Sequence, residues 1–318
     1  MAEYIEFTSD ELEKNLLDES EPFPLPFLQL FSDINQQDLD KVKKIWPKVS
    51  QQRKVTLLND LENLMQIDTL ISCDDFGFFA LDDEDPIVKS QAIALLWECT
   101  DLNLASRYMK ILQEDKDPEL SAAAASGLGR FVLLGELDEI PKEHFKKVMQ
   151  TLIEKYLTSQ SNSLKQSILE SLGYVSNAQI NSFITEAINK PEKEWVLSAL
   201  FAISRSANEY WGKIVLEKLN DLDPDIQLEA VKAAGELEIS DSKEIIMEIL
   251  ENTLPEEELH LQSIWSLSMI GGNDVQKLFD NLLESSDNDQ EMGMLEMAID
   301  NLELTNSFDE IDYFDDDY

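Results

Sequence analysis

Apolar residues recur at spacings of three and four along most of the chain, separated by acidic and amide side chains. This spacing places the apolar residues on one face of an α-helix. The sequence contains no run of alternating Val, Thr or Tyr of the kind that forms a half-buried β-strand. The pattern therefore predicts an all-α protein.

The helical pattern repeats. One short amphipathic sequence pattern, which we call the phrase, recurs along the chain. Its copies start at Asp85, Asp117, Ser161, Glu192, Asp223 and Glu256, with a looser seventh copy at Asn288. The starts lie 31 to 33 residues apart, except for one interval of 44. A second amphipathic stretch follows each phrase, so each unit is a helical hairpin of about thirty residues that cannot bury its own apolar faces alone. The predicted fold class is an α-solenoid of stacked helical hairpins.

We align the copies and number their positions from the first residue of each, so that column one holds Asp85, Asp117 and the other starting residues. Several columns have the character that stacking requires. In column one, Asp or Ser can cap the helix, and the Pro that follows it in three copies is harmless in the first turn. Column four is apolar in the first six copies, namely Val88, Leu120, Leu164, Trp195, Ile226 and Leu259. Columns eight and eleven favour small residues, namely Ala92, Ala124, Ala199, Ala230 and Ser263, then Ser171, Ala202, Ala233 and Ser266. Small side chains let neighbouring helices approach to about 8–10 Å.

The pattern also predicts how the chain is organised. Residues 1–32 form an irregular N-terminal extension, in which Pro22 to Leu30 favour an extended path lying on the end of the stack or serving as a ligand for an SH3-like domain. Residues 33–84 form a helical cap and residues 85–304 a solenoid of about seven units. Residues 305–318 are expected to be an acidic disordered tail that aids solubility or docks on a partner. The long interval is expected to lengthen a loop and a second helix.

The repeat resembles the short HEAT-like repeats of the phycobilisome-lyase type. The resemblance is carried by Asp-Pro-x-(Val/Leu/Ile), a small residue four positions later and a glycine in column thirteen, and it covers about residues 75–303. It departs from that pattern because the fifth-column Arg is absent and column thirteen varies. That column reads Gly129, Gly173 and Gly235, but Trp97, Ser204 and Ser268 elsewhere. The resemblance implies a HEAT-like solenoid whose first helices line a concave face.

Charge and composition narrow the range of partners. The formal net charge is -40, which repels phosphate backbones and anionic membranes, so neither nucleic acid nor a membrane is an expected partner. The acidity favours solubility or a basic partner protein. We expect no secretory signal and no membrane span, and the two cysteines, Cys73 and Cys99, are expected to be small buried hydrophobes in a reducing cytoplasm.

The sequence offers no pattern for a catalytic, metal or cofactor site. Its two histidines, His144 and His260, are not followed by Glu, whereas HEAT-like metal hydroxylases bind iron through repeated His-Glu pairs. The glycine-rich stretches lack a phosphate-binding fingerprint, and Gly271 with Gly272 is better explained as a helix stop. The basic segment from Lys41 to Lys54 is either a contact for an acidic partner or a solvated helix face.

A partner-binding surface is predicted on the first helices of the later repeats. Columns six, ten and fourteen should face the groove, and there they carry large apolar groups and one lysine: Leu197, Phe201, Leu228, Lys232, Leu261, Trp265 and Met269. These side chains either bury one another or bind a partner helix or peptide, because aromatic anchors in an apolar strip commonly dominate affinity. Trp97 and Trp195 fall in packing columns.

The sequence therefore predicts a monomeric, cytoplasmic, non-enzymatic scaffold, without cofactor, that binds a protein or peptide on its concave face. Bilin lyases share the repeat, so a lyase-like or enzyme-accessory protein acting on a chromophore or protein substrate is the alternative. A third hypothesis is an acidic mimic of nucleic acid that occupies a basic protein.

Overall fold

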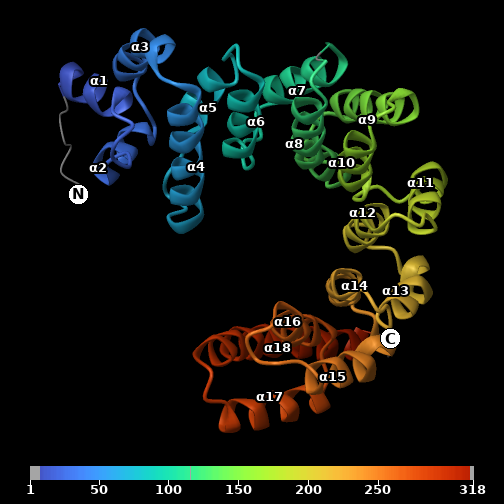
Figure 1. Ribbon diagram of the computed structural model, residues 1–318. Helices are drawn as coiled ribbons and strands as arrows, with labels where there is room; N and C mark the ends of the chain where they lie inside the picture. The colour runs from blue at the N-terminus through green and yellow to red at the C-terminus, as the bar shows by residue number, and fades with distance from the viewer. Residues whose placement is uncertain (1–7, 115, 316–318) are drawn as a thin grey trace. The chain divides into compact units, whose positions relative to one another are not determined.

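The computed structural model describes residues 8–114 and 116–315, with the backbone alone for residue 9 and for residues 306–315. Among these residues every regular element is a helix, as the sequence predicts (Figure 1). The chain divides into two compact units, Met1–Ser171 and Leu172–Tyr318, which we describe one at a time.

The first unit contains the N-terminal elements and the first repeats. Its helices are α1 (Ser9–Leu17), α2 (Leu25–Leu28), η1 (Gln29–Phe31), α3 (Gln36–Ile45), η2 (Trp46–Lys48), α4 (Gln51–Ile67), α5 (Asp74–Ala80), α6 (Pro86–Leu95), α7 (Leu102–Glu114), α8 (Pro118–Glu136), α9 (Lys142–Thr158) and α10 (Asn162–Leu172), whose last residue falls in the second unit.

The second unit contains the remaining repeats. Its helices are α11 (Ala178–Ile188), α12 (Lys193–Ser204), η3 (Glu209–Trp211), α13 (Gly212–Lys218), α14 (Pro224–Glu236), η4 (Ser240–Ser242), α15 (Lys243–Glu251), α16 (Glu258–Ile270), α17 (Asn273–Ser285) and α18 (Asp289–Asp315).

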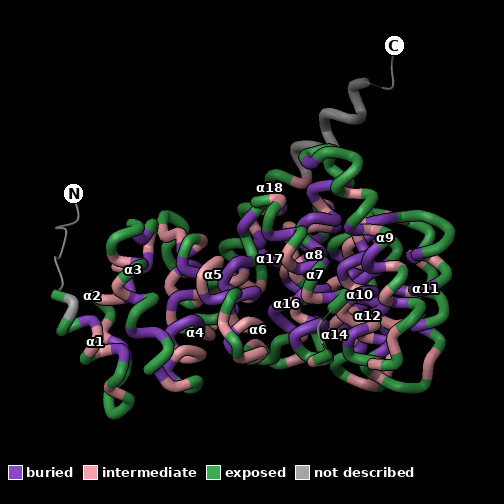
Figure 2. The backbone as a smooth tube through the Cα atoms, turned by 90° about the horizontal axis from the view of Figure 1, so that it is seen from above, coloured by how far each residue is buried: buried purple, intermediate pink, exposed green. Residues whose placement is uncertain are grey.

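Each unit is built from two layers of helices. In the first unit, α4, α6 and α8 pack in succession as one layer. The second helices α5 and α7 pack against α6 and α8, the first helices of the next hairpins, and α9 packs against both α7 and α8. In the second unit, α12, α14, α16 and α18 form the first layer, and α13, α15 and α17 form the other (Figure 1). Along each helix, buried stretches alternate with exposed ones (Figure 2). The architecture is an α-solenoid of stacked helical hairpins.

The repeated helices begin where the sequence predicts. Asp85, Asp117 and Asp223 are the N-caps of α6, α8 and α14, and each side chain accepts a hydrogen bond from a backbone N–H of the first turn, at 2.8 to 3.0 Å. The Pro after each cap lies in the first turn. The caps compensate backbone donors that the helix itself leaves unpaired, and each contributes about 1 kcal/mol.

The small columns lie at the closest contacts between first helices. Every residue of columns eight and eleven named above is at most 1% exposed. A Cβ atom added at Gly173 would lie 2.7 Å from the Ala202 carbonyl oxygen, and one at Gly235 would lie 2.8 Å from the Cα of Ser266. Column thirteen of one repeat therefore contacts column eleven of the next, which explains the glycine that recurs there.

A recurring hydrogen bond joins the same columns. The hydroxyl of Ser171 donates to the carbonyl of Ala125 at 2.9 Å, and the hydroxyl of Ser266 donates to the carbonyl of Val231 at 2.9 Å. In both cases column eleven donates to column nine of the preceding repeat. The serines thus satisfy their own buried hydroxyls while they join successive first helices.

Two expectations for the repeats need correction. Leu259 was expected to face the core, but it is half-buried, and the neighbouring His260 is buried at 4% exposure. This is because α16 has its N-cap at Glu257, one residue later than the copy starts. The extra residues of the long interval lengthen not only α9 but also the first helix α8, which has 19 residues.

The N-terminal segment is more helical than expected. Pro24 keeps an extended backbone, but the chain turns helical at Leu25 instead of continuing along a polyproline-like path. Phe31 is fully buried, with its ring centroid 4.5 Å from that of Phe76 in α5. Burial of apolar side chains against the next hairpin outweighs the local preference for an extended chain.

The C-terminal boundary also differs from the expected one. The backbone of α18 continues as a helix to Asp315, past the expected end of the solenoid at residue 304. Residues 316–318 of the expected acidic tail lie outside the described residues. In the part of the chain that the structure describes, no helix has the length and apolar character required to cross a membrane.

Replacing Gly235 with Ala should destabilise the protein by about 1–3 kcal/mol, because the new Cβ forces the close contact with Ser266 to open. Gly293→Ala is the matched control, since a Cβ there meets no atom within 4 Å, and it should stabilise α18 by about 0.5–1 kcal/mol. Urea unfolding followed by circular dichroism measures both. Equal effects of the two substitutions would contradict the role of column thirteen.

Candidate functional site

The predicted partner-binding residues lie on α12, α14 and α16 of the second unit. Six of the seven are partly exposed, namely Leu197, Phe201, Leu228, Lys232, Trp265 and Met269. Leu261, which was expected in the groove, is instead buried at 8% exposure. Successive helices of this layer pack against one another, so the six residues belong to one face. We call them the apolar stripe.

Two cations lie on or beside the stripe. The Arg205 guanidinium carbon lies 4.0 Å from the ring centroid of Phe201 and 4.8 Å from that of Tyr174, so one face of the Phe201 ring is already covered. The Lys232 amino group lies 3.7 Å from a carboxylate oxygen of Glu229 and 3.6 Å from one of Glu258. Both cations are therefore engaged within the protein, and Trp265 is the stronger candidate for an aromatic anchor.

One residue of the same face was missed by the sequence interpretation. Met297 occupies column ten of the loosely matching seventh copy and is 61% exposed on α18, which packs against α16. Hydrogen bonds from Asn301 and Thr305 of α18 to Ser268, at 3.0 and 3.1 Å, hold these two helices together. The signal was the column position itself, since column ten carries Phe201, Lys232 and Trp265 in the preceding copies.

The two tryptophans assigned to packing columns behave differently. Trp195 is buried at 3% exposure, as expected, and the Lys190 amino group lies 3.4 Å from its ring centroid. Trp97 is 50% exposed, so its assignment to the core was wrong. The reason is local, because α6 ends at Leu95 and column thirteen lies beyond the helix in that copy.

The basic segment from Lys41 to Lys54 is largely neutralised within the first unit. Lys41 and Lys48 pair with Asp38 and Glu13, at 2.6 and 2.7 Å. Arg53 is buried at 5% exposure, and its guanidinium donates to the Glu21 carbonyl at 2.9 Å. The segment therefore contributes to the packing of the N-terminal helices, and little of its charge is left for an acidic partner.

The most buried of these ion pairs joins Lys54 to Asp83. Their charged atoms are 2.7 Å apart, and the side chains are 12% and 5% exposed. The Trp46 indole also donates to the carboxylate of Asp83, at 2.6 Å. Burial raises the pKa of this carboxyl, but the hydrogen bonds from Lys54, the Asp85 amide and Trp46 outweigh burial and hold the pKa below its ordinary value.

A buried polar cluster joins α16 to α18. The His260 Nε2 lies 2.7 Å from the Glu291 carboxylate, and its Nδ1 lies 3.1 Å from the Thr253 hydroxyl. Ser286 donates to the other carboxylate oxygen of Glu291. Glu291 occupies column four, which is apolar in the other copies, so this carboxylate is buried where a hydrophobic side chain normally lies. Its partners compensate the loss of solvation, and all four groups are engaged with one another.

The cysteines match their expected role as buried side chains. Cys73 and Cys99 are free and are 1% and 6% exposed. Burial raises the pKa of the Cys73 thiol to about 12 and that of Cys99 to about 11. Both thiols are therefore protonated near neutral pH and unreactive as nucleophiles. Among the described residues, no group of three or more His, Cys, Asp or Glu side chains is placed to hold a metal ion.

Comparisons with known proteins find no match in sequence and only distant matches in structure. No protein-family model and no curated protein matches the chain. Among solved structures, the Escherichia coli protein YibA has a TM-score of 0.46 at 13% identity, covering 90% of this chain and 98% of its own. At these values the likeness carries no argument of its own.

Two further structures are similarly distant. Human deoxyhypusine hydroxylase in complex with glycerol gives a TM-score of 0.36 at 13% identity, covering 93% of this chain and 96% of its own. A Kap95p complex with RanGDP gives 0.44 at 13% identity, with coverage of 92% and 41%. The phycobilisome-lyase type of the repeat is not confirmed. The assignment of the fold rests on the order and packing of the helices described above.

Asp83→Asn should lower the free energy of unfolding by about 3 kcal/mol at neutral pH, because it leaves Lys54 buried beside a neutral amide. A carboxyl with a lowered folded-state pKa stabilises the fold above its unfolded pKa and loses this contribution as the pH falls through the folded value. The difference from the natural protein should therefore shrink below about pH 4. Asp40→Asn, which removes an exposed pair with Lys43, is the control and should change stability by less than about 0.5 kcal/mol.

Glu291→Ala should destabilise the protein by about 3–5 kcal/mol, because His260 is left buried without its partner. Replacing His260 and Glu291 together with Leu should cost no more than the single change, since column four then regains its apolar character. A double-mutant cycle in urea gives the coupling between the two side chains. Additive losses would show that the two side chains act independently.

Proposed function

We propose that the second unit is a non-catalytic binding module that holds a short apolar and basic segment of a partner protein along the apolar stripe. The partial exposure of the stripe is the observation that supports this proposal. Columns eight and eleven of the same helices are at most 1% exposed, whereas Leu197, Leu228 and Trp265 remain half-buried. These side chains are partly covered by the stack of helices and still expose apolar surface to solvent.

The charge around the stripe favours a basic partner. The second unit contains half of the acidic residues of the chain but only a third of the basic ones. Glu194 and Glu258, on α12 and α16, are exposed. The basic side chains on this face, Lys232 and Arg205, already contact carboxylates or aromatic rings of the protein itself. Glu258 is partly neutralised by Lys232, at 3.6 Å, so a partner with Lys or Arg beside its apolar residues would meet negative charge that the protein only partly neutralises.

A binding role accounts for the polar groups better than catalysis does. The titratable side chains buried in this unit, His260 and Glu291, bind each other and two hydroxyls and are 4% exposed. A general acid or base must reach its substrate within hydrogen-bond distance, and these groups are enclosed. The free thiols of Cys73 and Cys99 support a reducing compartment, and we propose a cytoplasmic location. A monomeric state is part of the same proposal.

The stripe can be tested with two helical peptides, one with Leu and Lys at helical spacing and one with Glu in place of each Lys. The natural protein should bind the basic peptide more tightly, as measured by fluorescence anisotropy. Trp265→Ala should weaken that binding about 10-fold or more, because a central aromatic anchor commonly contributes at least 2 kcal/mol. Trp97→Ala removes a more exposed indole from the other unit and should leave binding unchanged.

Thermal unfolding of the same variants separates binding from folding. Trp265→Ala should melt close to the natural protein, since its side chain is only partly buried. If Trp265→Ala instead lowers the melting temperature strongly and leaves the peptide affinity intact, the stripe is part of the core and the proposal fails.

A further inference from the structure

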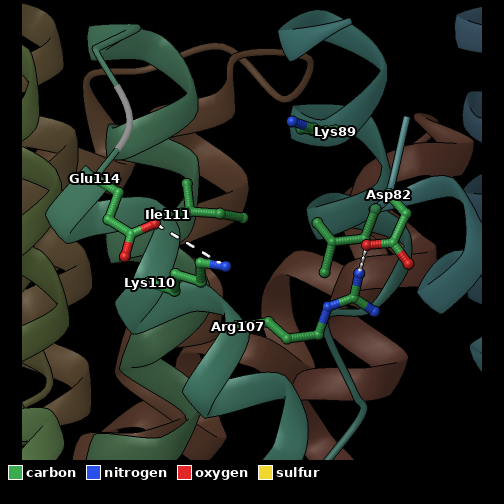
Figure 3. Close-up of a pocket in the computed structure, with 7 residues that line it drawn as sticks. Asp82, Lys89, Arg107, Lys110, Ile111 and Glu114 are labelled. Atoms are coloured by element: carbon green, nitrogen blue, oxygen red, sulfur yellow. Dashed lines mark hydrogen bonds and ion pairs between the residues drawn. The ribbon is translucent and has the colours of Figure 1, made fainter. Parts of the chain in front are cut away.

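A hollow of about 490 Å³ lies in the first unit, between the start of α6 and the outer face of α7. Leu81 and Ile111 supply its apolar lining, and three basic residues, Lys89, Arg107 and Lys110, line it as well. Figure 3 shows the side chains of Lys89 and Lys110 entering the same space from different helices. Three basic residues around one hollow are notable in a protein with a net charge of -40.

The positive charge of this hollow is incompletely neutralised. Arg107 is engaged, because its guanidinium pairs with Asp82 and donates to the Phe78 carbonyl at 3.1 Å. The Lys110 amino group lies 4.0 Å from Glu114, at the outer limit of an ion pair, and the Lys110 side chain is 72% exposed. The Lys89 backbone N–H donates to the Asp85 carbonyl at 3.1 Å, but the Lys89 side chain forms no ion pair or hydrogen bond with any other described residue. Two ammonium groups share this space with one loosely held carboxylate, so an added anion would be attracted.

A second basic hollow lies beside the same helix. It measures about 480 Å³ and is lined by Ser106 of α7 and by five residues of α9, in which two lysines outnumber one carboxylate: Glu143, His144, Lys146, Lys147 and Gln150. Lys146 and Lys147 are exposed and, among the described residues, form no ion pair. Ser106 and Lys110 are four residues apart, so they lie on the same face of α7. The two hollows therefore flank one exposed helix face.

We propose that this surface, which we call the basic face and define by Lys89, Lys110, Lys146 and Lys147, binds a short acidic segment of a partner protein. Carboxylates of the segment would reach the lysines of both hollows, and an apolar side chain would cover Ile111. This site goes beyond the proposed function, because it lies in the other unit and selects the opposite charge. Two hollows on one helix face fit an extended ligand with several anionic groups better than a single small ion.

A short segment also fits the overall charge better than nucleic acid does. Charges interact over about 8–10 Å at physiological salt, so a short ligand experiences mainly the local lysines. A long polyanion would extend beyond the basic face into the field of a molecule with net charge -40. The acidic residues of the first unit thus limit the length of the ligand.

The test uses the full-length protein and a short dye-labelled peptide rich in Glu with one Leu, compared with its Gln counterpart. Anisotropy should show binding of the Glu peptide alone, and the affinity should fall as salt is raised. Lys89→Gln with Lys110→Gln should weaken binding about fivefold, and so should Lys146→Gln with Lys147→Gln, because each pair removes about two screened surface ion pairs. Lys213→Gln with Lys277→Gln makes the same change in net charge on exposed lysines of the second unit and should have no effect.

Competition experiments distinguish other ligands. Inorganic phosphate and a single-stranded oligonucleotide should displace the labelled peptide only weakly. Displacement by phosphate at concentrations comparable with those of unlabelled peptide would mean a single-ion site and would overturn the proposal, as would tighter binding of the oligonucleotide. Equal losses in the control variant and in both basic-face variants would reduce the effect to net charge and would also overturn it.

Discussion

The close approach of successive first helices is the constraint on which the rest of the structure depends. A single hairpin of this chain has too little surface to bury its apolar residues, so each hairpin requires the next one. Column thirteen allows that approach where it is glycine, because a Cβ at Gly173 or Gly235 would overlap the neighbouring helix. Ser171 and Ser266, the serines of column eleven, also form hydrogen bonds across contacts of this kind. The small side chains at these columns and the hydrogen bonds of the serines together specify how successive hairpins stack.

This stacking decides which side chains remain available for binding. Once columns eight and eleven are enclosed, column ten is left at the edge of the contact on α12, α14 and α16. Phe201, Trp265 and Met297 occupy such positions, in column ten of their copies. Their partial exposure follows from the geometry of close-packed helices. Partly exposed apolar side chains therefore remain on the first helices without any irregularity in the fold.

Acidic and basic residues are distributed differently in the two units, which the composition of the whole chain does not show. In the first unit many basic residues support the fold, as Lys54 does beside Asp83 and Arg53 does beneath the N-terminal segment. The lysines of the basic face are the exception, because the structure gives them few partners. In the second unit, acidic residues outnumber basic ones more strongly, and the one buried carboxylate at column four, Glu291, requires His260 to hold it. Acidic residues outnumber basic ones in both units, and the first unit carries a local group of lysines within that acidic surface.

The sequence by itself determined the helical class, the hairpin period, the capped helix starts and the small columns, since these depend on local spacing and on side-chain size at fixed positions. It also predicted that columns six, ten and fourteen of these helices face away from the closest contacts, and six of the seven residues named there are partly exposed. Only the tertiary structure decided that Leu261 is buried, that Trp97 is exposed and that Leu25 begins a helix, because each outcome depends on where a helix ends or what packs against it. Only the tertiary structure decided which lysines form ion pairs. Whether a lysine is paired or free depends on carboxylates that lie far away in the chain, as the separation between Lys54 and Asp83 shows.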